Sequence, residues 1–321
     1  MIFEATTENI KKAAEAITSG EIIAFPTETV YGLGADGLNP TAVARIFEAK
    51  NRPSFNPLIL HIAELNQLYD LVECNSKKVK KLVETFWPGP LTLVLPKKEI
   101  VPDIVTAGNS TVAIRMPKHP VALKLIEISG KPIAAPSANT FGFLSPTTAK
   151  HVQKQLGNKI DIILDGGKSN VGVESTILEI IEDDVYLLRP GGISIEQLEE
   201  VCGKIEIKQP DSNNPVAPGQ LLNHYAPNIP IMFLDEISEQ NVKDKKIAGL
   251  FFKENRSTLK FEQVEILSPS GSLHEAAANL FHHLHTLEST NVDMIIVEPV
   301  EESGLGIAIM DRLLKATNRY K

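Results

Sequence analysis

The chain has 321 residues, a formal net charge of −8 and two cysteines, Cys74 and Cys202. This length exceeds the usual size of one domain and predicts two, with a core large enough to need no disulfides. The negative charge argues against broad non-specific binding to nucleic acid, although residues 51–150 hold 12 Lys and Arg against 7 Asp and Glu. Two distant cysteines without metal-ligand spacing fit a reducing compartment.

The N-terminus lacks a basic segment followed by an apolar run, and no stretch approaches the roughly 20 apolar residues that span a bilayer. We therefore expect a soluble, cytoplasmic protein that makes no contact with a membrane.

Helical and strand-like patterns alternate along the first 208 residues, which is typical of an α/β fold. The predicted helices cover Thr7–Thr18, a segment from Pro40 that stops before Pro53, a segment containing Lys77–Lys81, and 120–129. The predicted strands cover Ile22–Phe25, Leu58–Ile62, the end of 87–96, Thr111–Met116, the start of 132–139, 160–164, 174–179 and 185–189.

Residues 209–230 carry five prolines and few charges, so we expect an interdomain linker there. Strand-like runs at 231–234, 247–252, 264–267 and 292–297 then surround a helix over 272–287, and a last helix covers 306–316. This pattern predicts a first domain over residues 1–208 and a small second α/β domain over residues 231–321.

The stretch Gly20–Gly34 is the most informative part of the chain. Proline ends the predicted strand Ile22–Phe25, and the polar Thr27, Glu28 and Thr29 follow at the strand end, where α/β sheets present groups to ligands. The next helix delivers Lys50 and Arg52 beside this loop. Two cations next to hydroxyl groups indicate a site for an anionic ligand.

Three short sequence motifs lack the surrounding features that their usual functions require. Residues 32–37 satisfy G-x-G-x-x-G, but six residues separate Phe25 from Gly32, so we interpret these as turn glycines and not as a dinucleotide site. Gly167-Lys-Ser169 lacks the first glycine of a P-loop, and His274-Glu275 lacks the second histidine of H-E-x-x-H. We interpret His282, His283 and His285 as a solvated or partly packed helix face, and Lys77–Lys81 as a solvated one.

A distributed set of polar residues remains, all at or beside predicted strand ends. Arg115 is the hardest to dismiss, because a charge rarely lies in an apolar run without a partner or a bound anion. The set comprises Thr29, Lys50, Arg52, His61, Arg115, Ser137, Asn139, Ser175, Thr176 and Arg189.

These residues lie in blocks that resemble the YrdC/Sua5 family, the threonylcarbamoyl-AMP synthases of tRNA modification. The resemblance covers about residues 7–205, and the remainder is similar to the long Sua5 form. The blocks are Pro26-Thr-Glu-Thr-Val-Tyr-Gly-Leu-Gly34, Lys50-Asn-Arg-Pro53, Asn56-Pro-Leu-Ile-Leu-His61, Pro136-Ser-Ala-Asn139, Ser175-Thr-Ile177, Arg189-Pro-Gly191, His224-Tyr-Ala-Pro227 and 304–312.

The resemblance implies a twisted mixed-sheet YrdC-like domain followed by a small Rossmann-like domain. It implies an enzyme that joins L-threonine, bicarbonate and ATP, with Mg²⁺, into threonylcarbamoyl-AMP and diphosphate. The product would pass to the tRNA threonylcarbamoyl-transfer complex for modification of adenosine 37, and contact with tRNA itself would be indirect or weak.

The resemblance also implies roles for individual residues. Lys50 and Arg52 would be catalytic, and no protein side chain would bind the metal. Threonine would bind to Thr29, His61, Arg115 and Ser175. ATP or the adenylate would bind to Lys50, Arg52, Asn56, Thr111, Ser137, Asn139, Ser145, Arg189 and the linker residue Tyr225. The linker segment Ala217-Pro-Gly-Gln-Leu-Leu-Asn223 departs from the family pattern in lacking a hydroxyl and a cation, and we keep a lid-like role for it as a hypothesis.

Two alternatives stay open. The first is a module that binds tRNA or double-stranded RNA without adenylate chemistry; the net charge and the lack of interleaved aromatic residues disfavour it. The second is a carbamoyl-adenylate enzyme of hydrogenase maturation. That class also carries an acylphosphatase-like region and zinc-finger cysteines, which this chain lacks.

Overall fold

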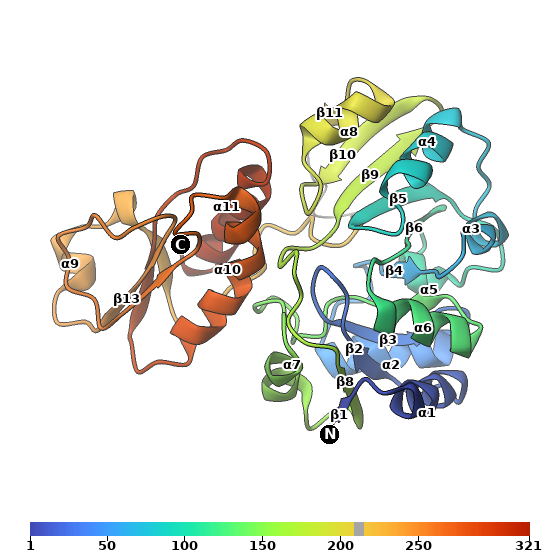
Figure 1. Cartoon of the computed structure of the whole chain (residues 1–321), viewed down its shortest axis with the longest axis horizontal. Coiled ribbons are helices and arrows are strands. Elements are labelled where there is room, and N and C mark those ends of the chain that lie inside the picture. Colours follow the sequence, from blue (N-terminus) through green and yellow to red (C-terminus); the bar gives the residue numbers. More distant parts are fainter. Residues whose placement is uncertain (209–214) are drawn as a thin grey trace.

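The structure, a computed structural model, describes residues 1–208 and 215–321. It consists of two α/β bodies that lie side by side, with the N-terminus in the larger and the C-terminus in the smaller (Figure 1). Among the described residues, no helix is long and apolar enough to cross a membrane.

The larger body is built on an eleven-stranded mixed sheet in the order β1-β8-β2-β3-β7-β4-β6-β5-β9-β10-β11. Its strands are β1 (Ile2–Glu4), β2 (Ile23–Phe25), β3 (Gly32–Asp36), β4 (Ile59–His61), β5 (Leu91–Pro96), β6 (Thr111–Arg115), β7 (Ile133–Ala134), β8 (Ile162–Asp165), β9 (Thr176–Ile181), β10 (Asp184–Arg189) and β11 (Glu206–Ile207). Its helices are α1 (Thr7–Thr18), α2 (Pro40–Lys50), α3 (Leu65–Leu71), α4 (Lys77–Phe86), α5 (Asp103–Thr106), α6 (Pro120–Ser129), α7 (Ala149–Leu156) and α8 (Ile195–Cys202).

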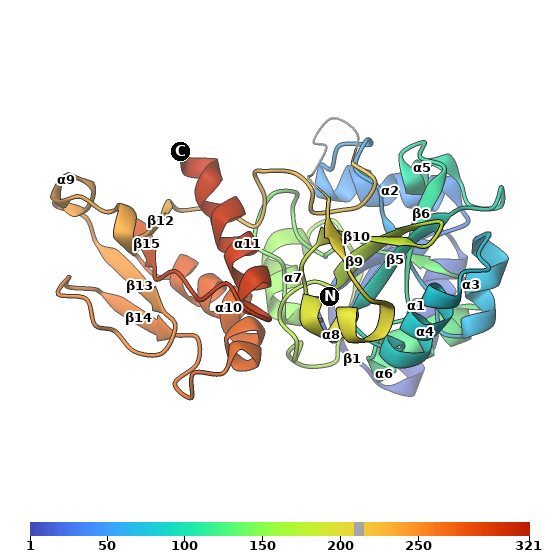
Figure 2. The same cartoon turned by 90° about the horizontal axis from the view of Figure 1, so that it is seen from above.

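The smaller body has a four-stranded parallel sheet in the order β12-β15-β13-β14. Its elements are β12 (Ile231–Phe233), a 3₁₀ turn (Leu234–Glu236), α9 (Glu239–Val242), β13 (Ile247–Phe251), β14 (Gln263–Ile266), α10 (Leu273–Glu288), β15 (Met294–Val297), α11 (Gly306–Thr317) and a final 3₁₀ turn (Asn318–Tyr320). Helices α10 and α11 lie between this sheet and the larger body in both views (Figures 1 and 2). The mixed sheet and the parallel second sheet confirm the predicted fold class.

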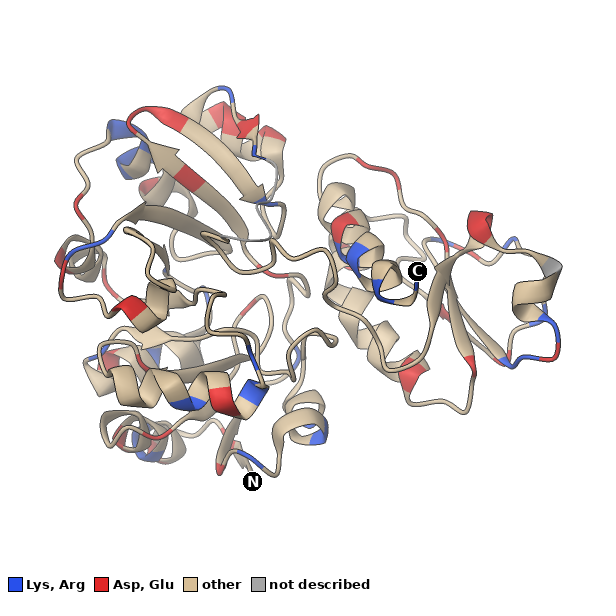
Figure 3. Ribbon diagram, turned by 180° about the vertical axis from the view of Figure 1, so that it is seen from behind, with Lys and Arg blue, Asp and Glu red and all other residues tan. Residues whose placement is uncertain are grey.

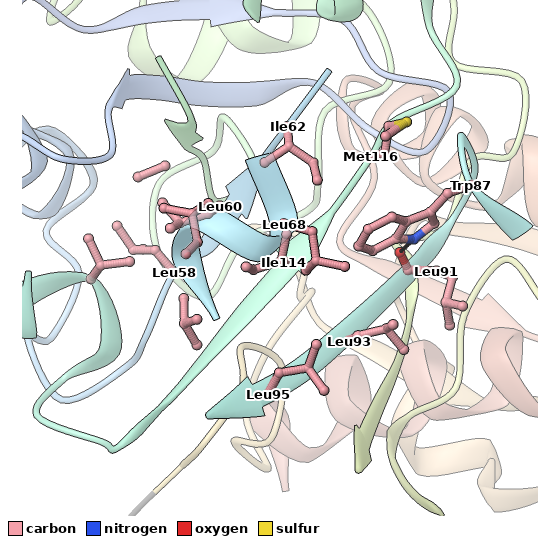
Figure 4. Packing of buried hydrophobic residues seen from close by; sticks show 14 of the residues in the cluster. Leu58, Leu60, Ile62, Leu68, Trp87, Leu91, Leu93, Leu95, Ile114 and Met116 are labelled. Carbon is pink, nitrogen blue, oxygen red and sulfur yellow. Dashed lines mark hydrogen bonds between the residues drawn. The ribbon is translucent and has the colours of Figure 1, made fainter. Parts of the chain in front are cut away.

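The main core of the larger body lies between its sheet and helices α2 and α4. Because side chains alternate along a strand, Leu60, Leu93 and Ile114 point to this core, where Leu68 and Trp87 pack against them (Figure 4). The neighbouring residues Ile59, Val94 and Ala113 therefore point to the opposite face. There they form a small apolar cluster with Ile177, Leu188 and the linker residue Ala217.

The predicted bounds of helix α1 and the predicted start of helix α2 at Pro40 are confirmed. Thr6 caps α1, accepting from Asn9 N, and Asn39 caps α2, whose first residue is Pro40. Asn51 ends α2 in the left-handed conformation, with φ of 52°. Lys77, Lys80 and Lys81 on α4 are exposed, as expected of a solvated helix face.

The interpretation of Gly32–Gly37 as a turn was wrong, because Gly32–Asp36 forms the buried strand β3. This strand pairs antiparallel with β2, so that Leu33 faces Ala24. A Cβ at Gly34 would lie 2.7 Å from Phe25 Cε1 and 2.8 Å from Ile133 Cγ2. The glycine is therefore required by the close approach of neighbouring side chains, not by a turn.

The three histidines of α10 are partly packed, and carboxylate partners exist that the sequence did not reveal. The His285 ring stacks on His151 of α7 with ring centroids 3.9 Å apart, and His283 Nδ1 lies 2.7 Å from Glu265 Oε2. Among the described residues, no group of three or more His, Cys, Asp or Glu is arranged to hold a metal ion.

Candidate active site

The sheet face opposite the main core carries polar residues where its strands end. His61 follows Ile59 on β4 by two positions, and Arg115 follows Ala113 on β6 by two, so the pleat points them to the same side. The register pairs His61 directly with Arg115.

These strand ends open into a partly open cavity of about 50 Å³. The loop after β2, the loop after β7, the start of β9 and the linker close it from the other sides. The lining residues are Thr27, Thr29, Val30, Tyr31, Gly32, Arg52, Ile59, His61, Arg115, Ala135, Pro136, Ser137, Glu174, Ser175, Arg189, Pro218, Gly219, His224 and Tyr225.

Arg115 lines the cavity and is held by three partners. Its Nη1 donates to Thr29 Oγ1 at 2.9 Å, its Nε donates to Gly89 O at 3.3 Å, and its Nη2 lies 2.6 Å from Glu28 Oε1. Arg115 and Glu28 are each only 4% exposed. Thr29 Oγ1 is also 2.9 Å from Thr27 Oγ1, so the loop after β2 holds the guanidinium in one orientation.

His61 lies beside Arg115 and is neutral. Burial and, to a smaller extent, the charge of Arg115 together lower the pKa of His61 to about 3. Its Nδ1 is 3.2 Å from Ile59 O, and its ring meets the edge of Phe25 with centroids 6.2 Å apart. A neutral imidazole can donate or accept a hydrogen bond from a ligand without adding charge.

Arg52 also lines the cavity. Its Nη2 donates to Asn56 Oδ1 at 2.7 Å and to Pro57 O at 2.9 Å, and its guanidinium lies 5.8 Å from the Phe141 ring centroid. Burial lowers the pKa of Arg52 to about 9. No carboxylate among the described residues forms an ion pair with Arg52, so its charge is available to an anion.

Lys50 does not line the cavity but lies behind the Ser137–Asn139 loop. Its Nζ donates to Ser137 O at 2.6 Å and to Asn139 O at 2.5 Å, and burial lowers its pKa well below the ordinary value, with a further contribution from Arg52. The Ser137 hydroxyl in turn donates to Asn139 Oδ1 at 2.5 Å. In this conformation Lys50 therefore holds the loop in place.

Arg189 and Ser175 form one unit at the start of β9. Arg189 Nη2 donates to Ser175 O at 2.9 Å and to Ser175 Oγ at 3.2 Å. Ser175 Oγ is also 2.7 Å from Thr92 Oγ1 on β5. The third guanidinium nitrogen of Arg189, Nη1, donates to Pro218 O at 3.2 Å and so contacts the linker.

Four residues of the linker, Pro218, Gly219, His224 and Tyr225, line the cavity. Tyr225 is 2% exposed, and its ring is 4.1 Å from the His224 ring. Gly219 has φ of +87°, and a Cβ there would lie 2.7 Å from Arg189 Cδ and 2.8 Å from Tyr225 Oη. Burial raises the pKa of Tyr225 to about 12.

The structure thus brings most of the predicted site residues together. Eight line the cavity: Thr29, Arg52, His61, Arg115, Ser137, Ser175, Arg189 and Tyr225. Four more of the predicted residues do not line the cavity but form a hydrogen bond with a residue that does: Lys50, Asn56, Asn139 and Ser145. Thr111 lies at the far end of β6, on the same face as Arg115 but outside the cavity. Thr176 is buried and donates to Ile193 O at 2.7 Å, which is a structural contact.

Sequence reasoning missed three contributors. Thr92 was an isolated hydroxyl within the apolar run of β5, and Glu174 was a carboxylate directly before an apolar strand. Arg312 was a charge in the helical pattern of the last helix, the same type of signal that singled out Arg115. In each case the signal was a polar residue in an apolar pattern.

The family models match nearly the whole chain. The model described as "Telomere recombination", which covers Sua5, YciO and YrdC, matches residues 15–191. The model described as "Threonylcarbamoyl-AMP synthase, C-terminal domain" matches residues 193–318.

Relatives from distant organisms match over nearly their full length. The threonylcarbamoyl-AMP synthase of Pyrococcus abyssi is 46% identical, with 96% of this chain and 94% of the relative covered. That of Bacillus subtilis is 45% identical, with 96% and 92% covered. The crystal structure of P. abyssi Sua5 complexed with L-threonine matches with a TM-score of 0.92 at 43% identity and covers 99% of this chain and 98% of that chain. The chain therefore belongs to the YrdC/Sua5 family of threonylcarbamoyl-AMP synthases, in its two-domain form.

Proposed function

We propose that the chain is a threonylcarbamoyl-AMP synthase, which converts L-threonine, bicarbonate and ATP into L-threonylcarbamoyladenylate, diphosphate and water. The observation that carries the proposal is one cavity that is lined by Arg115, Arg52 and Arg189 together with hydroxyl groups. Three guanidinium groups in one cavity suit a ligand with several negative charges, and their planar forks suit carboxylate and phosphate oxygens.

The part of the cavity that Arg115 lines is the proposed threonine site. The P. abyssi relative was crystallised with L-threonine, and the fold of that complex superposes on this chain over nearly its whole length. Arg115 would pair with the threonine carboxylate, while Thr29 Oγ1, Ser175 Oγ and the neutral His61 ring offer hydrogen bonds to its polar groups. Glu28 balances part of the Arg115 charge, so that the pocket accepts an amino acid zwitterion and not only an anion.

The part of the cavity that Arg52 and Arg189 line is the proposed nucleotide site. Arg52 and Arg189 would contact the phosphates, with Tyr225 of the linker closing the site above them. Asn56 and Asn139 orient Arg52 and the Ser137 loop from behind, and Lys50 supports that loop. Ser145 contacts the cavity wall through its hydrogen bond to Glu174. Thr111 lies on the same face of the sheet as Arg115, at the other end of β6 and outside the cavity.

The reaction needs no nucleophile from the protein. The threonine amine attacks CO₂ derived from bicarbonate and loses a proton, which gives an N-carboxylate. An oxygen of this N-carboxylate attacks the α-phosphorus of ATP, and the bond to the bridging oxygen breaks, so that diphosphate leaves with its electron pair. The chain holds the two reactants in contact and stabilises the charge at the phosphorus with Arg52 and Arg189.

The described residues offer no free carboxylate cluster for a resident metal, because Glu28 is paired with Arg115 and Glu174 with Arg312. Mg²⁺ would therefore enter as part of the substrate, bound to the phosphates of ATP, where it neutralises their charge.

The linker must move for ATP to bind. The free space of about 50 Å³ is far below the roughly 300–1,000 Å³ of ordinary pockets for small molecules. Pro218, Gly219, His224 and Tyr225 fill the space beside Arg52 and Arg189. We therefore propose that the linker opens to admit ATP and closes over the bound nucleotide.

The product would then pass to the tRNA threonylcarbamoyl-transfer complex in the cytoplasm.

Mass spectrometry of the purified full-length chain tests this function. With ATP, Mg²⁺, L-threonine and ¹³C-bicarbonate, we expect an adenylate that carries one ¹³C atom and is absent when threonine is omitted. An adenylate without the label, or none at all, would contradict the proposal. Salt-sensitive tRNA binding without turnover would favour the RNA-binding alternative.

A further inference from the structure

Arg312 on α11 is the largest of the fully buried side chains in the described part of the chain and is only 1% exposed. It belongs to the second domain, but its guanidinium crosses into the first. Its Nε donates to Glu174 Oε2 at 2.8 Å, and its Nη2 donates to Pro190 O at 3.0 Å. Its Nη1 donates to Asp311 Oδ2 at 2.5 Å, so every nitrogen of the fork is used.

Glu174, the partner of Arg312, is part of the cavity wall. Its other carboxylate oxygen, Oε1, accepts from Ser145 Oγ at 2.5 Å, and its backbone carbonyl accepts from Gly192 N at 3.0 Å. The next residue is Ser175, which holds Arg189 through its backbone and side-chain oxygens. Burial raises the pKa of Glu174, but the charges of Arg312 and Arg189 outweigh this and lower it, so Glu174 is ionised.

The same helix also holds the linker over the cavity. Arg312 lies over the Tyr225 ring, with Cζ 5.0 Å from the ring centroid. Lys315, one helical turn later, donates to Gly219 O at 2.7 Å and pairs with Asp311 at 2.7 Å. Figures 1 and 2 show α11 on the side of the second domain that faces the first, and Figure 3 shows that the helix carries charges of both signs.

We propose that Arg312 is a positioning residue of the active site, supplied by the second domain: by binding Glu174 it sets the position of Ser175 and Arg189, and by packing on Tyr225 it sets the position of the linker. The second domain thus completes the site, a role that rests on the proposed synthase function.

Domain cohesion alone explains this contact poorly. A buried ion pair is weak evidence for stability, because the loss of hydration offsets much of the attraction. The domains also share an apolar cluster in which Val30 and Leu144 of the first domain pack with Leu280 and Phe281 of α10. Arg312 is therefore not the main cohesive contact, and its distinguishing feature is that it reaches the cavity wall.

A double-mutant cycle on the full-length chain tests the proposal. The variants are Arg312→Met, Glu174→Gln and the double variant, with Lys154→Met as the matched control. Lys154 is an exposed cation that bridges to Glu288 of the second domain at 3.4 Å without lining the cavity. Steady-state rates give kcat and KM for threonine and for ATP, and calorimetry gives Kd for each ligand without turnover.

We expect Arg312→Met to lower kcat/KM by about tenfold to a hundredfold, since a displacement of about 1 Å costs as much as a hundredfold. Because Arg312 acts partly through Glu174 and partly through Tyr225, the loss in the double variant should be clearly smaller than the product of the two single losses. Lys154→Met should have wild-type kinetics. Arg312→Lys, which keeps the charge but not the fork, should recover part of the rate and replaces Arg312→Met if that variant does not fold.

Additive losses in the double variant, or wild-type kinetics in a folded Arg312→Met protein, would overturn the proposal. Failure of the synthase function itself is recognised separately, because the wild-type protein would then make no adenylate. In that case the ligand Kd values still decide the role of Arg312: non-additive changes support it, and unchanged or additive values reject it.

Discussion

Arg115 and Glu28 form a buried ion pair in which Nη2 and Oε1 are 2.6 Å apart and each side chain is 4% exposed. Such a pair cannot be broken without leaving a buried charge, which costs about 3–5 kcal/mol of stability when one partner is removed. Arg115 is nevertheless the residue proposed to bind the threonine carboxylate, so its charge serves both Glu28 and the ligand.

The first prediction concerns the shape of this cation. Arg115→Lys keeps the positive charge beside Glu28 but loses the planar fork that contacts Thr29 and Gly89. We expect KM for threonine to rise by about tenfold or more while KM for ATP changes little, because one bidentate charge-assisted contact is worth about 1.5–3 kcal/mol. The measurement is initial rate against each substrate. Lys124→Met, at an exposed position of α6, is the control, and an equal rise in both KM values would contradict the prediction.

The second prediction concerns Arg52. Arg52→Ala should lower kcat/KM for ATP by about a hundredfold or more, the usual loss when one donor to a charged transition state is removed. Since no ion pair is broken, thermal unfolding should show that the protein remains folded. Arg45→Ala removes an arginine from the surface of the preceding helix α2, where Arg45 pairs with Glu21 at 2.7 Å, and should leave the rate unchanged. An unaltered rate in Arg52→Ala would remove Arg52 from the catalytic set.

The third prediction concerns the closed linker. Gly219→Ala places a Cβ 2.7 Å from Arg189 Cδ at a φ of +87°, so the linker should no longer seat beside Arg189. We expect faster proteolytic cleavage of the linker than in the wild-type protein. We also expect ATP and threonine together to protect the linker from cleavage in the wild-type protein but not in the variant. Gly108→Ala is the matched control, because Gly108 has φ of +83° with no atom near the added Cβ. Equal cleavage of the two variants would show that backbone strain alone is responsible.

The fourth prediction concerns pH. His151 of α7 stacks on His285 of α10. The pKa of His151 is lowered to about 3, mainly by burial and also by the neighbouring groups His285, His282 and Lys154, while Glu288 raises it. The folded state therefore keeps His151 neutral, while the unfolded chain binds a proton below about pH 6.5. The stabilisation is complete above that pH and is lost progressively as the pH falls toward 3.

Thermal unfolding from pH 7.5 to pH 4.5 checks this sign. His151→Phe retains an aromatic ring at the interface but cannot be protonated, so its Tm should fall less over this range than that of the wild-type protein. The same slope of Tm against pH in both proteins would contradict the role of His151.

The sequence predicted the elements well where local signals were strong. Caps and breakers marked α1, α2 and α6. Strands β4 and β6 were recognisable as short apolar runs that contain His61 and Arg115. Strand β3 was missed because its glycines resemble a turn, and only the ring of Phe25 and the side chain of Ile133 explain why they are needed. Such close approaches depend on tertiary structure and leave no local pattern.

The site was predictable as a set of residues but not as an arrangement. Polar residues at strand ends indicated most of the cavity lining, including Thr29, Arg115 and Ser175. The sequence did not indicate that Lys50 contacts backbone carbonyls, or that Arg312 from the far end of the chain reaches Glu174. Both contacts connect segments that are distant in sequence, and the packing of the two domains alone brings Arg312 to the cavity.

The central claim is that this cavity joins threonine, bicarbonate and ATP. The most direct measurement is diphosphate release by the purified chain with ATP and Mg²⁺, from which threonine and bicarbonate are omitted in turn. The account predicts release only when both are present, and its loss in Arg52→Ala. Release that continues without threonine, or no release with all substrates present, would contradict it.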